Sequence, residues 1–76
     1  MNYTIMYSVD MASSQELSLN KKGNSYNVLL ANANNGTSVT FTSIDKALEK
    51  YNKLVECFAK GLYSYEDRVK ILIKEI

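Results

Sequence analysis

The stretch Asn34-Asn35-Gly36 separates two strand-like runs, residues 25–33 and 37–42, and a long amphipathic segment follows the second run. Asparagine followed by glycine accepts the positive φ angles of a two-residue type I′ turn, which joins antiparallel strands. A turn at Asn35-Gly36 predicts facing pairs that share one side of a sheet, namely Leu30 with Phe41 and Asn32 with Val39. The stretch therefore predicts a β-hairpin that leads into a helix.

Two further strands are expected before this hairpin. Residues 2–9 alternate in character, as the residues of a half-buried strand do. Their core side is predicted to hold Tyr3, Ile5, Tyr7 and Val9, and the other side Met6. A short strand then leads to a turn at Lys22-Gly23, which places Leu19 opposite Tyr26 and Leu17 opposite Val28. Because both hairpins put their apolar residues on one shared face, the sequence favours an antiparallel meander.

Two helices are expected after the strands. The first begins in a capping-box sequence, Thr42-Ser43-Ile44-Asp45, and ends at Gly61, and the second begins at Ser64. Apolar residues recur at helical spacing in the first helix: Ile44, Ala47, Leu48, Tyr51, Leu54, Val55 and Phe58. The second helix has a shorter stripe: Val69, Leu72, Ile73 and Ile76. The predicted fold is α+β, an antiparallel three- to four-stranded β-meander (residues 1–42) with two C-terminal helices (residues 43–76) packed on one face.

Size and composition limit the classes of function that the chain can have. The 76 residues, 46% of them hydrophobic, are expected to form a single domain. With one cysteine, no histidine and no ligand-like carboxylate trio, the chain predicts no metal site, no cofactor and no catalytic residues, so we expect no enzyme. No apolar run approaches the roughly 20 residues of a membrane helix, so a soluble, cytoplasmic protein without membrane contact is expected. The net charge of +1 gives no general attraction to nucleic acid.

The first predicted helix carries a lysine arc, defined as Lys46, Lys50, Lys53 and Lys60. Acidic residues occupy the neighbouring arc, so the pattern fits a solvated face with weak helix-supporting ion pairs. It also fits a basic stripe that contacts nucleic acid or an acidic partner. Cys57 falls on the same arc, where the neighbouring lysines would lower its pKa, and an intermolecular disulfide is the first role to test for it.

The expected corner between the helices is rich in aromatic and acidic side chains. Exposed tyrosines are common anchors of protein interfaces. The candidate partner-binding residues are therefore Tyr63, Tyr65, Glu66 and Asp67 at the corner, with Lys46, Lys50 and Lys53 from the lysine arc.

More than half of the chain, from Ser25 to Arg68, resembles small phage-encoded anti-CRISPR proteins that inhibit Cas9-type nucleases. The resembling features are the strand 26–30, the turn 34–36, the strand 39–41, the helix end 57–61 and the segment 63–67. The best-known members are strongly acidic and imitate DNA, whereas this chain is near neutral. The resemblance therefore implies steric binding to another surface of the effector nuclease, in the cytoplasm of the phage's host.

Three functions are consequently expected. The first is a non-enzymatic inhibitor from a phage or mobile element, with a host CRISPR effector nuclease as its protein partner. The second is a nucleic-acid-binding accessory protein that uses the lysine arc together with Lys21 and Lys22. The third is a structural homodimer that pairs an exposed sheet edge.

Overall fold

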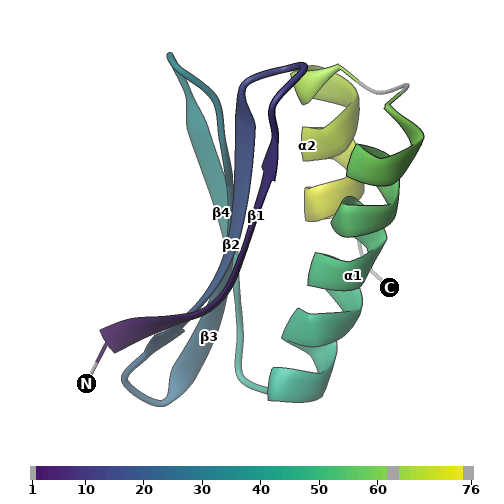
Figure 1. The fold of residues 1–76 in the computed structure, drawn as a ribbon. Helices are drawn as coiled ribbons and strands as arrows, with labels where there is room; N and C mark the ends of the chain where they lie inside the picture. Colours follow the sequence, from purple (N-terminus) through teal and green to yellow (C-terminus); the bar gives the residue numbers. More distant parts are fainter. Residues whose placement is uncertain (1, 62–63, 75–76) are drawn as a thin grey trace.

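The sheet and the helices form two layers (Figure 1). The computed structural model describes residues 2–61 and 64–74. The elements in chain order are β1 (Asn2–Asp10), β2 (Gln15–Lys22), β3 (Ser25–Ala31), β4 (Gly36–Phe41), α1 (Ile44–Lys60) and α2 (Tyr65–Ile73). The strands pair antiparallel in the order β1-β2-β3-β4, and both helices lie on one face of the sheet. The predicted α+β meander with two C-terminal helices is confirmed.

The β2–β3 turn is one position later than predicted. Lys22 pairs with Ser25, so the two turn residues are Gly23 and Asn24, and Gly23 has a φ of 60°. Glycine reaches this angle without a steric penalty, which explains the position of the turn. Leu19 consequently lies opposite Val28 rather than Tyr26.

The β3–β4 connection is a four-residue loop, 32–35, between the paired residues Ala31 and Gly36, so the predicted two-residue turn is wrong. The side-chain oxygen of Asn32 accepts hydrogen bonds from the amides of Asn34 (3.0 Å) and Asn35 (2.7 Å). These bonds stabilise the loop without positive φ angles at Asn35 or Gly36. The predicted pairs change accordingly: Val39 lies opposite Val28, and Phe41 opposite Tyr26.

β1 contains a β-bulge, and this bulge overturns the predicted alternation. The β1–β2 register shifts between Thr4 and Met6, so Ile5 is an extra residue. Met6 then lies opposite Leu19, on the helix-facing side, whereas it was predicted to face away. Tyr7 was predicted to lie on the core side and instead lies opposite Ser18, on the face that no described helix covers.

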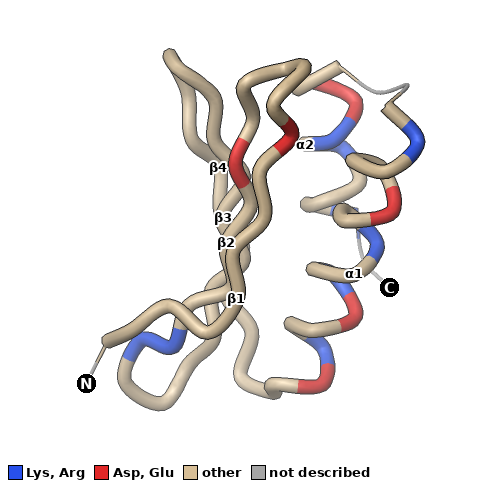
Figure 2. Tube along the Cα trace, viewed as in Figure 1, with Lys and Arg blue, Asp and Glu red and all other residues tan. Residues whose placement is uncertain are grey.

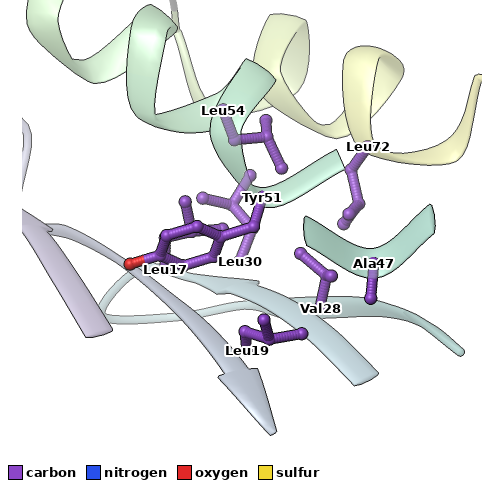
Figure 3. Close-up of a cluster of buried hydrophobic side chains, with 8 residues drawn as sticks. All are labelled: Leu17, Leu19, Val28, Leu30, Ala47, Tyr51, Leu54 and Leu72. Carbon is purple, nitrogen blue, oxygen red and sulfur yellow. The ribbon is translucent and has the colours of Figure 1, made fainter. Parts of the chain in front are cut away.

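The core lies between the sheet and the two helices (Figure 3). It is formed by Leu17, Leu19, Val28, Leu30, Ala47, Tyr51, Leu54 and Leu72. The remaining apolar residues of the stripe predicted for α1 pack against this cluster, which confirms that stripe. The hydroxyl of Tyr51 lies 2.6 Å from Ser8 Oγ and connects α1 to β1.

The helix ends agree only in part with the capping prediction. Gly61 ends α1 with a φ of 66°, and the hydroxyl of Ser64 accepts a bond from the amide of Asp67 (3.2 Å). The capping box predicted from Thr42 to Asp45 is wrong, because the N-cap of α1 is Ser43 and its side chain makes no capping hydrogen bond. In α2 the predicted stripe is wrong at Ile73, which is 59% exposed, and its other end, Ile76, lies outside the described residues.

Candidate functional site

Exposed apolar side chains gather on β1 and the residue that follows it. Among the described residues, the large hydrophobic side chains that remain exposed are Tyr3, Ile5, Met6, Tyr7, Val9, Met11 and Ile73. All but the last lie between residues 3 and 11, with exposed fractions from 38% to 83%. Their exposure follows from topology, because β1 is an edge strand and the helices lie mainly over the other three strands. A cluster of this kind in a folded protein marks an interaction surface.

The exposed apolar surface follows the β1 edge rather than the whole open face of the sheet. Across that face, Tyr7 neighbours Ser18 of β2, and Val9 neighbours Glu16. The phenol of Tyr7 donates a hydrogen bond to the Glu16 carboxylate (2.6 Å), and this bond raises the pKa of Tyr7. Polar neighbours on β2 therefore confine the apolar surface to one strand.

The C-terminal end of β1 is fixed by Arg68 and the residues that contact its guanidinium, which we call the Arg68 cluster: Asp10, Ser13, Gln15, Cys57, Phe58 and Arg68. The guanidinium Nη1 lies 2.9 Å from Asp10 Oδ2 and 2.9 Å from Gln15 Oε1. It also donates to the hydroxyl of Ser13 (3.1 Å). Arg68 is 1% exposed and Asp10 is 12% exposed, so this ion pair is largely shielded from water. The cluster thus joins β1 and the β1–β2 turn to α2.

The rest of the guanidinium contacts α1. Nη2 donates to the backbone oxygen of Cys57 (3.3 Å), and the guanidinium carbon lies 4.5 Å from the centre of the Phe58 ring. Nε finds no hydrogen-bond partner among the described residues. Hydrogen bonds from Ser13 and from Arg68 hold the pKa of Asp10 below its ordinary value of 3.8. Asp10 is therefore ionised at neutral pH and balances the buried charge.

Lys50 does not belong to the exposed lysine arc. It is 2% exposed, and its ammonium donates to the backbone oxygens of Ile71 (2.7 Å) and Lys74 (2.6 Å). These carbonyls lie at the C-terminal end of α2, where the helix dipole favours a cation. Burial lowers the pKa of Lys50, and the neighbouring charges of Lys53 and Lys74 act in the same direction. The other lysines of the arc, Lys46, Lys53 and Lys60, are exposed, and Figure 2 shows the cationic positions along α1.

Cys57 is likewise buried, at 7% exposure, although the sequence predicted a surface thiol. Burial is the main influence on the thiol and raises its pKa, which reverses the predicted direction. The predicted exposed arc wrongly included Lys50 and Cys57. Lys50 follows Ala47 by three residues, and Cys57 follows Leu54 by three, so both positions border the apolar stripe of α1. Lys50 therefore lies against α2, and Cys57 lies beside Arg68, rather than in water.

The structure separates the candidate corner residues from one another. Tyr65 is half-buried, and its hydroxyl lies 3.1 Å from Thr37 Oγ1 and donates to the backbone oxygen of Leu30 (3.2 Å). Glu66 and Asp67 are exposed in the first turn of α2. Tyr63 lies outside the described residues. Tyr65 is thus an internal contact between α2 and the sheet, whereas Glu66 and Asp67, the other described candidates at this corner, are exposed.

Sequence reasoning missed the most polar part of the interior. Arg68 stands four residues before Leu72, so helical spacing alone puts it on the buried face of α2. The β1 surface was missed for a different reason: the bulge that turns Tyr7 and Val9 outward has no signal in the alternating pattern.

No helix within residues 2–61 and 64–74 has both the length and the apolar character needed to cross a membrane. The same residues contain no group of three or more histidine, cysteine, aspartate or glutamate side chains arranged to hold a metal ion. Comparison with protein-family models, with curated proteins and with solved structures finds no match to this chain.

Proposed function

We propose that this protein is a small non-enzymatic binding protein that occupies a surface of a larger protein through β1 and acts without turnover. The observation that carries the proposal is the gathering of exposed apolar side chains on this edge strand. An edge strand offers unpaired backbone groups, and an extended segment of a partner can add to it as a further strand. Apolar side chains on β1 would then pack beside those of the added strand.

The chemistry of β1 specifies the kind of segment. Its only charged residue is Asp10, and that carboxylate is already paired with Arg68. A neutral, largely apolar segment therefore suits this edge better than a charged one. The bulge at Ile5 disturbs the N-terminal half of the strand, so regular pairing is expected along residues 6–10. The Arg68 cluster fixes the C-terminal end of residues 6–10, which reduces the entropy cost of ordering this segment when a partner binds.

For the partner itself, the resemblance to anti-CRISPR proteins directs the proposal to a CRISPR effector nuclease, inhibited by steric occupation. The charge of +1 supports contact with a protein surface rather than imitation of DNA. An edge strand whose single carboxylate is already paired supports the same choice, because a DNA mimic would present rows of carboxylates.

The two other expected functions gain less support. Burial of Lys50 removes one cation from the lysine arc, and Lys21 lies 4.7 Å from the centre of the Tyr26 ring, which partly shields it. A nucleic-acid site would thus rest on fewer lysines than predicted. A second copy of the chain could also pair along β1, and the same experiment distinguishes this outcome.

The test uses purified protein and a purified, guide-loaded Cas9-type effector. Binding is measured by size-exclusion chromatography and inhibition by DNA cleavage, at about 50 mM and about 200 mM salt. Val9→Lys places a charge on the apolar edge, and Asn52→Lys places the same charge on the exposed face of α1 as a control. Circular dichroism checks that both variants are folded.

We expect a stoichiometric complex that persists at the higher salt, is lost with Val9→Lys and is retained with Asn52→Lys. Equal binding by both variants would show that β1 is not the contact. Binding that disappears at the higher salt would transfer the assignment to phosphate contacts. Self-association that Val9→Lys abolishes, without binding to the effector, would establish the homodimer instead.

A further inference from the structure

The opposite edge of the sheet offers a second kind of surface, because β4 runs beside α2 with open hollows between them. The first hollow, of about 420 Å³, is bounded by Gly36, Thr37, Tyr65, Glu66, Val69 and Lys70. The second, of about 230 Å³, is bounded by Val39, Phe41, Lys46, Leu72, Ile73 and Lys74. The start of β4 thus faces the start of α2, and the end of β4 faces the end of α2. The two hollows therefore lie one after the other along β4 and α2, and we refer to the pair as the groove.

The side chains of β4 fix how a partner would enter this groove. Thr37, Val39 and Phe41 lie on the helix-facing side of the strand, and each of them borders one of the hollows. β4 is also the last strand of the sheet. A segment that paired with β4 would point every second side chain toward α2.

The two hollows differ in charge. Lys70 and Glu66 balance each other at the first hollow. The second is cationic: Lys46 and Lys74 border it together with the ammonium-bearing Lys50, and no described acidic residue lines it. Neither Lys46 nor Lys74 forms an ion pair with a carboxylate among the described residues. Its walls include Val39 and Ile73, which can pack against the aliphatic part of a glutamate side chain.

We propose that β4 and α2 form a docking site for an extended segment of a partner protein that carries glutamate at the positions facing the second hollow and an apolar residue at the position facing the first. The segment pairs with the edge of β4, its glutamate carboxylates meet Lys46 and Lys74, and its apolar side chain packs against Val69. This site lies at the edge opposite β1 and does not depend on the function proposed for β1.

The test uses a fluorescent peptide of about eight residues, long enough to cover β4 in extended form. Threonine occupies every second position, glutamates occupy the intervening positions toward the amino end, and valine follows toward the carboxyl end. This order suits antiparallel pairing, the commoner arrangement. A matched peptide carries lysine in place of each glutamate. Affinity is measured by fluorescence anisotropy, and the site is mapped by amide shifts in the NMR spectrum of the intact protein.

We expect the glutamate peptide to bind, with amide shifts concentrated in Gly36–Phe41 and Tyr65–Ile73, and the lysine peptide to bind much more weakly. The double variant Lys46→Glu/Lys74→Glu should weaken binding on the order of tenfold, as the reversal of two partly exposed charges implies. Lys53→Glu, on an exposed position of α1 that borders neither hollow, is the control and should leave the affinity unchanged.

Two results would overturn the proposal. One is equal affinity for the glutamate and lysine peptides, and the other is amide shifts that map to β1.

Discussion

Two buried cations attach α2 to the rest of the molecule, and they are neutralised in different ways. Arg68 and Lys50 are 1% and 2% exposed. The Arg68 guanidinium has a carboxylate partner, Asp10, and further contacts with an amide oxygen, a hydroxyl, a backbone carbonyl and an aromatic ring. Lys50 has only the two carbonyls at the end of α2, with no carboxylate within ion-pair distance among the described residues.

The difference shows what each cation does for the fold. A planar guanidinium reaches several partners at once, and Arg68 uses this to connect α2 with β1, β2 and α1. An ammonium is a compact point charge, and Lys50 connects α1 with α2 alone. Arg68 therefore also fixes the strand proposed to bind the partner, whereas Lys50 acts within the helical layer.

The largest effect is expected from Arg68→Ala. Breaking a buried ion pair by removing one partner costs about 3–5 kcal/mol of unfolding free energy. Urea unfolding followed by circular dichroism measures the loss, and Lys70→Ala, an exposed position of the same helix, should change stability by less than about 0.5 kcal/mol. Arg68→Lys should recover only part of the loss, because one ammonium cannot reach Asp10, Gln15 and the Cys57 carbonyl together. Full recovery of stability in Arg68→Lys would contradict the role given to the planar guanidinium.

Lys50→Met should have a smaller effect. Methionine keeps much of the aliphatic stem but leaves the carbonyls of Ile71 and Lys74 without their donor, which costs about 1–3 kcal/mol. Methionine also removes the free-energy cost of burying an ammonium, and this gain offsets part of the loss in stability. The same urea experiment applies, with Lys53→Met, one turn further along α1 and exposed, as the matched control. A loss as large as that for Arg68→Ala would remove the distinction between the two cations.

The third effect is a loss of stability in acid that depends on Asp10. Its pKa is lowered in the folded state, so the unfolded chain binds more protons between the folded pKa and the ordinary value of 3.8. The stabilisation is therefore complete above that value and disappears as the pH falls through the folded pKa. Unfolding free energies measured from about pH 6 to about pH 2 should fall more for the wild type than for Asp10→Asn. Parallel curves would show that the Asp10–Arg68 pair contributes no acid dependence.

The sequence predicted the buried residues most reliably where an error in strand register left each side chain on the same face of the sheet. The turns at Gly23-Asn24 and at residues 32–35 both differ from the predicted positions, yet each register differs by an even number of residues. Because side chains alternate with a period of two, the same residues still reach the core. The bulge at Ile5 inserts one residue, an odd number, and it turned Tyr7 to the other face. Two residues of the surface proposed to bind a partner, Tyr7 and Val9, therefore face away from the helices because of this irregularity.

The burial of Arg68 and Lys50 was predictable from the sequence, but their contacts were not. Helical spacing from Leu72 marks Arg68 as a buried position, and spacing from Ala47 marks Lys50. Their partners, however, depend on tertiary structure: Arg68 and Gln15 are 53 positions apart in the chain. The choice among carboxylate, amide and carbonyl partners follows from how the layers pack, which periodicity does not describe.

The smallest effect is expected at alkaline pH and concerns Lys50. Two influences oppose each other: burial favours the neutral amine, whereas the two carbonyls and the dipole of α2 favour the ammonium. Burial prevails, so the folded pKa of Lys50 is below the ordinary 10.5, and the unfolded chain binds more protons in the interval between the two values. Stability then rises with pH across that interval. The wild type should therefore gain stability relative to Lys50→Met from about pH 8 to about pH 11. A wild type that loses stability relative to the variant over this range would show that the carbonyls and the helix dipole outweigh burial.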